Sequence, residues 1–170
     1  KDVNGLDDGI YAGNKGTGFL NISLSGDIVS TSTDINDADN SYGIYAIGYG
    51  TDVAASTTGD VTSNDRGVFV WNYGSGNTSI TSTGTVTAFN YRGIYAENDE
   101  TSAAYDITIK ANKVNAFDDG VVTVNYGFGS TTITATGTVK GGVGQTDQTA
   151  NSDGIYAWNG ATTKDLSITA

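Results

Sequence analysis

The chain lacks four residue types altogether, because its 170 residues include no cysteine, histidine, proline or methionine. Without cysteine there are no disulfides or thiol nucleophiles, and without histidine the commonest general base and metal ligand is missing. Basic residues are also scarce, with 8 Lys and Arg that form no cluster, which argues against nucleic acid and anionic membranes as partners. No apolar run approaches the ~20 residues of a transmembrane helix. We therefore expect no bound cofactor, no nucleic-acid partner and no membrane insertion by this chain.

The abundant residues are those of strands and turns. Thr, Val, Ile, Tyr, Ser, Asn and 24 glycines dominate, whereas the helix formers Leu, Glu, Lys and Arg are few. The 19 acidic residues outnumber the 8 basic ones and give a net charge of −11. Evenly placed Ile, Val and Tyr argue against a disordered Gly/Ser-rich linker. The composition predicts an acidic all-β protein.

One heptapeptide recurs six times along the chain. Four copies are close, with the sequences DGIYAGN, YGIYAIG, RGIYAEN and DGIYAWN, and RGVFVWN and DGVVTVN are looser copies. The glycines that anchor the copies are Gly9, Gly43, Gly67, Gly93, Gly120 and Gly154. Their spacings of 34, 24, 26, 27 and 34 residues are typical of a solenoid, in which each unit buries its apolar face against its neighbours.

Two further short segments recur between the heptapeptides. The second segment is NISLS, TSITS, DITIK, TTITA or LSITA, and the third is GDIVS, GDVTS, GTVTA, NKVNA or GTVKG. Three strands of about four residues, joined by turns, form one rung of a parallel β-helix in which alternate side chains point inward. A right-handed coil is the default for parallel connections. We predict an all-β, right-handed parallel β-helix with three-strand rungs, about six of them stacked.

Alternation within the heptapeptide divides its side chains between core and surface. The predicted inward column is Ile10, Ile44, Val68, Ile94, Val121 and Ile155. Five residues after the anchor glycine an asparagine recurs, at Asn14, Asn72, Asn98, Asn125 and Asn159, with Gly48 as the exception. Asn and Gly accept a left-handed backbone most readily, so we expect them to form the corner after the first strand, with stacked amides hydrogen-bonded along the column.

The two 34-residue intervals each contain an insertion. STSTDINDADNSY and GGVGQTDQTANSD both leave the same predicted corner, so we assign residues 1–170 to one domain with insertion loops at about 30–42 and 141–153. Solenoid insertions collect on one side, often the binding side. Tolerated loop length without function is the alternative.

Tandem GIYA-x-N blocks followed by ITSTGTVTA-type strands resemble the passenger domains of Gram-negative autotransporters, the type V secreted proteins. The likeness covers the whole chain. It implies a right-handed β-helix that is displayed on the bacterial cell surface or secreted, through a C-terminal β-barrel that this sequence does not contain. With no initiator methionine and a repeat that is open at both ends, we expect a fragment of a longer passenger domain. The group includes adhesins, aggregation factors, proteases and esterases, so the resemblance implies architecture and location better than activity.

Reactive groups that could converge in a catalytic site are scarce in the sequence. Asp7–Asp8 and Asp118–Asp119 are acid pairs, but neighbours on a strand point opposite ways and do not make one site. The candidates for Ca²⁺ ligands are Asp34, Asp37 and Asp39, in a loop without the central Gly and distal Glu of a calcium loop. We therefore expect no catalytic residue, and aspartates that serve corners and solubility.

The outward positions of the heptapeptide carry aromatic rings. We predict that the candidate binding residues are Tyr11, Tyr45, Phe69, Trp71, Tyr95, Tyr156 and Trp158. Rings on adjacent rungs can stack and stabilise the fold by ~0.5–1.5 kcal/mol per pair. Exposed aromatic strips also mark interaction surfaces. Stacking alone and stacking together with binding are both open, and both assume that Ile10 and Ala12 point inward.

Three functions follow as hypotheses. The first, which we expect, is a non-enzymatic cell-surface or secreted module for adhesion. It binds a host-cell surface protein or glycan, or a second copy of itself, through the aromatic stripe and the same-side loops. The second is a structural spacer that holds another domain away from the outer membrane. The third is a fragment of a carbohydrate-active β-helix enzyme.

Overall fold

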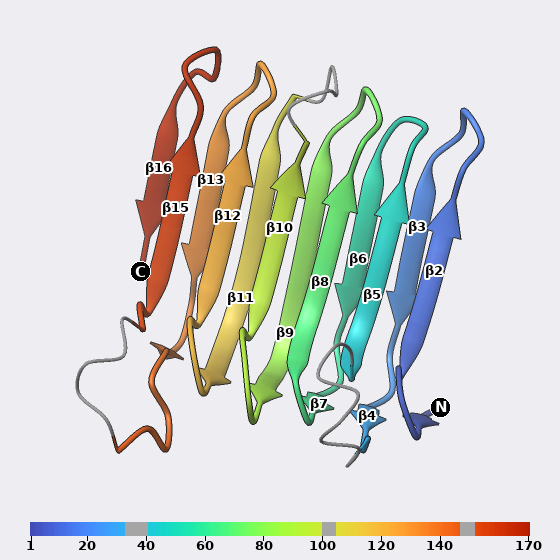
Figure 1. The fold of residues 1–170 in the computed structure, drawn as a ribbon, viewed down its shortest axis with the longest axis vertical. Coiled ribbons are helices and arrows are strands. Elements are labelled where there is room, and N and C mark those ends of the chain that lie inside the picture. Colours follow the sequence, from blue (N-terminus) through green and yellow to red (C-terminus); the bar gives the residue numbers. More distant parts are fainter. Residues whose placement is uncertain (33–40, 100–104, 147–151) are drawn as a thin grey trace.

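Two sheets of parallel strands make up the protein. The computed structural model describes residues 1–32, 41–99, 105–146 and 152–170, and these residues contain strands and turns but no helix. The two sheets lie face to face, with the N- and C-terminal ends of the chain at opposite ends of the stack (Figure 1). The predicted all-β fold with parallel strands is confirmed, and it is consistent with a β-helix-like solenoid.

The six heptapeptide copies form one six-stranded sheet, which we call the motif sheet. Its strands are β2 (Ile10–Asn14), β5 (Tyr42–Gly48), β8 (Arg66–Asn72), β10 (Ile94–Asn98), β12 (Val121–Asn125) and β15 (Ile155–Asn159). They lie side by side in sequence order, and every neighbouring pair is parallel. The register follows the repeat, so that Ile94 lies between Val68 and Val121. Equivalent residues of the six copies therefore form straight columns.

The second and third segments of the repeat form the second sheet. Its strands are β1 (Val3–Gly5), β3 (Leu20–Leu24), β4 (Ile28–Ser30), β6 (Val53–Thr57), β7 (Val61–Ser63), β9 (Thr78–Ala88), β11 (Ile107–Ala116), β13 (Thr131–Ala135), β14 (Val139–Lys140) and β16 (Leu166–Thr169). In the first repeat the chain passes from β2 in the motif sheet to β3 and then β4 in the second sheet. In β9 and β11 the second and third segments run on as one strand, with a register shift between Ala111 and Lys113. Each rung thus has two sheet faces, because the second and third strands share a sheet.

The apolar core lies between the two sheets. Ile44, Ile94 and Val121 of the motif sheet are fully buried, and they belong to one cluster with Ile109 and Ile133 of the second sheet. Ile10 and Ile155, in the first and last motif strands, are only partly buried because each has a rung on one side alone. The predicted inward orientation of the heptapeptide is confirmed.

The anchor glycines are required by close approach between rungs. A Cβ atom on Gly43 would lie 2.7 Å from the carbonyl oxygen of Gly67, and one on Gly120 would lie 2.7 Å from Cγ1 of Val139. Similar contacts surround Gly9, Gly67 and Gly93. Each of these five glycines is packed between the next copy and a Val or Ile of the third segment, so no larger residue fits there, whereas Gly154 in the last copy has only the carbonyl oxygen of Val139 at 3.4 Å.

The repeated asparagines work through their side chains. The backbone N–H of Gly74 donates to Oδ1 of Asn72 at 2.8 Å, and the amide of Asn72 donates to the carbonyl of Gly76 at 3.2 Å. The five asparagines are the last residues of their strands, and Gly48, at the equivalent position of β5, is not among the positive-φ glycines of the described residues, Gly142 and Gly144. The left-handed backbone expected at this corner is therefore wrong for Gly48 and stays a prediction for the asparagines. The buried side-chain amide of Asn72 is tolerated because it forms hydrogen bonds with backbone groups of the turn that follows the strand.

The amide column is continuous only in part. Asn98 donates directly to Oδ1 of Asn125 at 3.2 Å, whereas Thr131 donates its hydroxyl to Oδ1 of Asn159 at 2.7 Å and so joins the last rung to the column. Asn98 and Asn125 are fully buried. The predicted hydrogen bonding along the column is therefore confirmed for one direct amide pair, with threonine hydroxyls as the other links.

Aspartates outside the core hold successive rungs together. Oδ1 of Asp2 accepts the backbone N–H of Asp27 at 3.1 Å, and Oδ1 of Asp27 accepts that of Asp60 at 2.9 Å. At another corner, Oδ1 of Asp52 accepts the N–H of Asn77 at 2.7 Å and Oδ1 of Asp106 accepts that of Ser130 at 2.7 Å. The expectation that aspartates serve the corners is confirmed at these positions, and it accounts for much of the acidic composition.

The two insertions connect equivalent strands. The first joins β4 to β5 and the second joins β14 to β15, so both adjoin the edge where the motif strands begin. Residues 33–40 and 147–151 of these connections lie outside the described residues, and so do Asp34, Asp37 and Asp39.

Candidate functional site

The outer face of the motif sheet carries the aromatic side chains. Because Ile and Ala of each copy point into the core, the intervening residues point away from it. Register places all seven candidate residues in two outward columns. The first column is Tyr11, Tyr45, Phe69, Tyr95, Val122 and Tyr156, and the second is Gly13, Ile47, Trp71, Glu97, Val124 and Trp158.

Rings in the middle of this face pack into a cluster of their own. Phe69 stacks on Tyr95 with ring centroids 4.6 Å apart, and meets Tyr45 edge-on at 5.3 Å. Tyr42 stacks on Tyr45 at 4.5 Å and Tyr73 on Trp71 at 4.9 Å, although neither was predicted to belong to the site. The predicted stacking is confirmed.

Exposure on this face is uneven. Phe69 is only 9% exposed and Tyr42 only 5%, whereas Tyr11, Tyr156 and Trp158 are 64%, 44% and 38% exposed. The aromatic stripe is therefore not equally accessible along its length, because the central rings cover one another. The rings that another molecule could contact lie mainly at the two ends of the columns.

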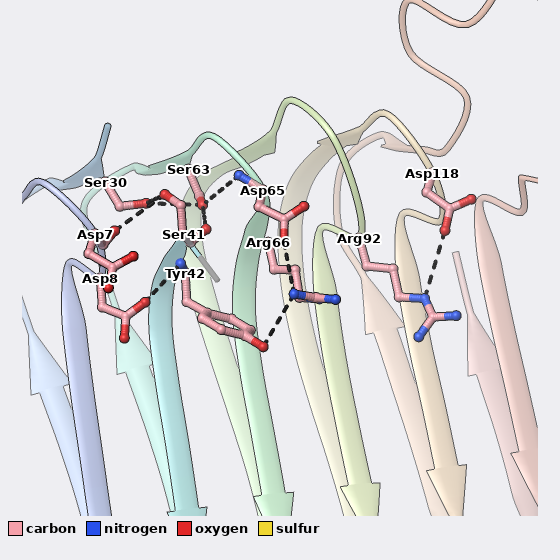
Figure 2. A network of polar contacts seen from close by, with 10 residues as sticks. All are labelled: Asp7, Asp8, Ser30, Ser41, Tyr42, Ser63, Asp65, Arg66, Arg92 and Asp118. Carbon is pink, nitrogen blue, oxygen red and sulfur yellow. Dashed lines mark hydrogen bonds and ion pairs between the residues drawn. The ribbon is translucent and has the colours of Figure 1, made fainter. Parts of the chain in front are cut away.

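Two arginines, Arg66 and Arg92, contact the aromatic rings near the start of the motif strands (Figure 2). Arg66 pairs with Asp65 at 2.8 Å, donates to the Tyr42 hydroxyl at 3.3 Å, and lies over the ring of Tyr91 at 4.5 Å from its centroid. Burial raises the pKa of Tyr42 to about 12, although the charge of Arg66 opposes this rise. Tyr42 is therefore a neutral hydroxyl at physiological pH.

Arg92 occupies the equivalent position one rung further along. Its Nε lies 3.2 Å from Asp119 and 3.9 Å from Asp118, and its guanidinium lies over Tyr95 at 5.3 Å. The expectation that Asp118 and Asp119 do not share a site is wrong. The two residues precede β12 in a bend, where strand alternation does not apply. Burial, followed by the charge of Asp119, raises the pKa of Asp118.

The other acid pair has a structural role. Oδ1 of Asp8 accepts the backbone N–H of Tyr42 at 3.0 Å, and burial raises the pKa of Asp8. The carbonyl of Asp7 accepts the hydroxyl of Ser41, which is 2.8 Å from the hydroxyl of Ser30 (Figure 2). These contacts fasten the first motif strand to the second.

Glu97 is the one acidic residue in the outward columns. The Tyr95 hydroxyl donates a short hydrogen bond to its carboxylate. Burial raises the pKa of Glu97, and burial together with this hydrogen bond raises the pKa of Tyr95. The outward position predicted for Glu97 is confirmed, but the carboxylate is partly buried against the rings.

A pocket interrupts the aromatic columns at β12. Both outward residues of this strand are valines: Val122 lies between Tyr95 and Tyr156, and Val124 lies between Glu97 and Trp158. The small side chains leave a hollow of about 320 Å³, lined by these two valines and the two tyrosines, with Arg92, Asp119 and Asp153 at its polar side. The looser heptapeptide DGVVTVN carried a signal for this hollow, because it alone has aliphatic residues at both positions.

The outer face of the motif sheet combines aromatic rings with an arginine and carboxylates. Asp119 at the pocket pairs with Arg92, and no group of three or more acidic residues in the described ranges could hold a metal ion. The parts of the chain that the structure describes hold no helix long and apolar enough to cross a bilayer. Aromatic faces beside fixed hydrogen-bonding groups are typical of small-molecule and partner recognition.

Comparison with known proteins adds no family to this description. No family model matches the chain, and no curated protein or solved structure matches it at a significant level. The resemblance to autotransporter passenger domains stays a prediction from the repeat. The function of the site is therefore argued from its geometry.

Proposed function

We propose that the chain is a non-enzymatic module of a bacterial cell-surface or secreted protein, built as a right-handed parallel β-helix that binds through the outer face of the motif sheet. In each repeat the chain crosses from the motif sheet to the second sheet and returns, which supports a continuous coil. In Figure 1 the motif strands in front run upward, those behind run downward, and the chain advances to the left. This direction of winding supports a right-handed coil.

The pocket at β12 is the observation that carries the proposal. The heptapeptide needs no such hollow to build a sheet, since an aromatic residue fills the first outward position in five of its six copies. Tyr156 and Trp158 remain 44% and 38% exposed beside it. Exposed Tyr and Trp next to a concave surface are the side chains that most often anchor a partner.

The face around the pocket is held in place before any partner arrives. Phe69 and Tyr95 stack on one side, and the ion pair between Arg92 and Asp119 closes the edge. Ordering of side chains on binding costs ~0.5–1.5 kcal/mol for each long side chain, so a face that is already ordered binds more tightly. The partner that we propose is a protein or glycan of a host-cell surface, or a sister copy.

A structural spacer is the second candidate function, favoured by the ring cluster itself. Stacked rings stabilise a rigid rod whether or not anything binds to it. A carbohydrate-active enzyme has less support, because Asp118 and Asp119 both lie beside Arg92, whereas hydrolysis needs carboxyl groups on either side of the bond.

Binding of the labelled chain to epithelial cells, to immobilised collagen, fibronectin and laminin, and to a glycan array separates the first two functions. The test variant is Tyr156→Ser with Trp158→Ser, and the control is Phe19→Ser. Phe19 is 70% exposed and lies outside the motif sheet. We expect binding that the control keeps and the double variant loses, with an unchanged far-UV circular dichroism spectrum. Binding to none of these surfaces, or equal binding by both variants, would favour the spacer.

A further inference from the structure

We propose that the pocket over Val122 and Val124 binds a neutral sugar ring, so that the ligand of this chain is an uncharged oligosaccharide. The inference rests on the proposed function, because it names the ligand class of the same face. It is carried by the shape of the hollow, by the charges that surround it, and by the groups that line it.

The spacing of the pocket walls fits one six-membered ring. Tyr95 and Tyr156 are two strands apart, and strands are separated by ~4.8 Å, which puts their columns ~9.6 Å apart. A six-membered ring in contact with the face of Tyr156 needs roughly 3.5–4 Å of this distance, the contact distance between carbon atoms, and the rest lies beside Arg92 and Tyr95. Phe69 covers one face of Tyr95, and the guanidinium of Arg92, which pairs with Asp119, lies over the same ring. The open wall of the pocket is therefore Tyr156, which is 44% exposed, whereas Val122 beneath it is only 2% exposed. A volume of about 320 Å³ is at the small end of ligand pockets.

The charges at the pocket disfavour charged ligands of both signs. The guanidinium of Arg92 lies over the ring of Tyr95, where it would repel a cation seeking that ring face. Asp119 and Asp153 line the same hollow in a chain of net charge −11, so an anion would be repelled as well. A neutral ligand with many hydroxyl groups meets neither penalty.

A sugar uses both kinds of surface that the pocket offers. One face of a pyranose carries C–H groups, which pack against the electron-rich face of an aromatic ring. Its hydroxyls can donate to the carboxylates of Asp119 and Asp153 and accept from Arg92. Asp119 is paired with Arg92 at 3.2 Å and accepts the backbone N–H of Asp153 at 2.9 Å, so these groups are positioned in advance.

The hollow continues along β12 toward a second aromatic platform. Val124 lies two residues beyond Val122, ~7 Å along the strand. Beside it, Trp158 contacts Tyr126 with ring centroids 4.6 Å apart, and both rings are more than one third exposed. A second sugar unit would lie over Val124 against Trp158. We therefore expect disaccharides to bind more tightly than the corresponding monosaccharides.

Calorimetric titration of the whole 170-residue chain tests the proposal. The probes are glucose, galactose, mannose and N-acetylglucosamine, their disaccharides cellobiose, lactose, mannobiose and chitobiose, and the charged compounds choline and galacturonate. Val122→Tyr fills the hollow with a ring that continues the column, and Tyr156→Ala removes one wall. Gly13→Tyr is the matched control, because it adds a tyrosine to the same outer face where a side chain meets open space.

We expect at least one neutral disaccharide to bind, and both pocket variants to weaken it by about tenfold or more. The Gly13→Tyr control should bind as the unchanged chain does. Tyr156→Ala should keep the far-UV circular dichroism spectrum of the unchanged chain, because Tyr156 is 44% exposed, which separates loss of the pocket wall from loss of the fold. Three results would overturn the proposal: no neutral sugar binds, both pocket variants bind the sugar as tightly as the unchanged chain does, or the chain prefers choline or galacturonate. If the chain binds matrix proteins but no sugar, the proposed binding function stands and only the sugar ligand is refuted. If it binds neither matrix proteins nor cells nor sugars, both the proposed function and the sugar ligand are refuted.

Discussion

Replacement of one anchor glycine tests the stacking of the rungs most sharply. Gly67 lies in β8, in the middle of the motif sheet. A Cβ atom there would collide with the carbonyl oxygen of Gly93 on the next rung and with Cγ1 of Val86 in the second sheet. The first obstacle is backbone and the second is a fully buried valine, so neither can move without displacing a rung.

The expected cost of Gly67→Ala follows from this overpacking. Extra methyl groups in a tightly packed core cost ~1–3 kcal/mol, and two collisions place this site near ~3 kcal/mol. For a chain of this size a loss of that kind lowers the unfolding temperature by about 6–12 °C. Gly13→Ala is the matched control, because Gly13 lies in β2 of the same sheet with nothing within 4 Å of the added atom. That change should stabilise the protein by about 0.4–1 kcal/mol, through the unfolded state.

The two variants are compared by thermal and urea unfolding followed by far-UV circular dichroism. We expect opposite signs, with Gly67→Ala destabilised and Gly13→Ala equal to or slightly more stable than the unchanged chain. Equal behaviour of the two variants would refute the argument, because it would mean that Gly67 does not lie between Gly93 and Val86.

Three further predictions concern pH, the ring cluster and the asparagine column. Burial raises the pKa of Asp8, Glu97 and Asp118, so the folded state binds protons more tightly than the unfolded state. Their stabilising contribution is complete below the unfolded pKa values near 4 and is lost as pH rises through the folded pKa values, so the unfolding temperature should increase as pH falls from 7 toward about 4. Glu97→Gln should make this increase smaller, and a steady fall over that range would contradict the assignment. Phe69→Ala should cost ~3 kcal/mol in urea unfolding but Tyr11→Ala less than ~1 kcal/mol, because 9% and 64% of these side chains are exposed; similar losses would show that the rings do not form a cluster. Asn98→Ala removes the amide bond to Asn125 and the acceptor of the Thr78 hydroxyl, and should cost ~1–3 kcal/mol by the same measurement. An unchanged midpoint would exclude the buried amide column.

The register of the fold could be predicted from the sequence because the repeat carries it. The anchor glycines and the Ile or Val that follows each of them define columns that the structure reproduces, as between Ile10 and Ile44. β6 was missed, because its VAAST segment has Ala55 where the other copies have isoleucine. The apolar signal of one short strand is lost when its central side chain shrinks to a methyl group.

The candidate site was only partly predictable, since exposure depends on contacts that the repeat does not encode. Alternation placed Phe69 on the outer face, but its burial comes from rings on neighbouring rungs and from Tyr42. Arg92 and Asp119 are 27 residues apart and meet because one rung separates them. The pocket itself needed the alignment of Val122 with its two neighbours, which only the sheet register provides.

The distance between the first and last copies of the heptapeptide tests most directly the claim on which the whole account depends, that the six copies stack as one in-register sheet. The chain has no cysteine, so spin labels can be placed through Tyr11→Cys and Tyr156→Cys alone. Both positions are exposed and belong to the same outward column. Five strand spacings separate them, which predicts a narrow distribution near ~24 Å, widened only by the label tethers, in double electron–electron resonance. A broad distribution, or a mean distance well beyond this value, would contradict the stacking and with it the pocket at β12.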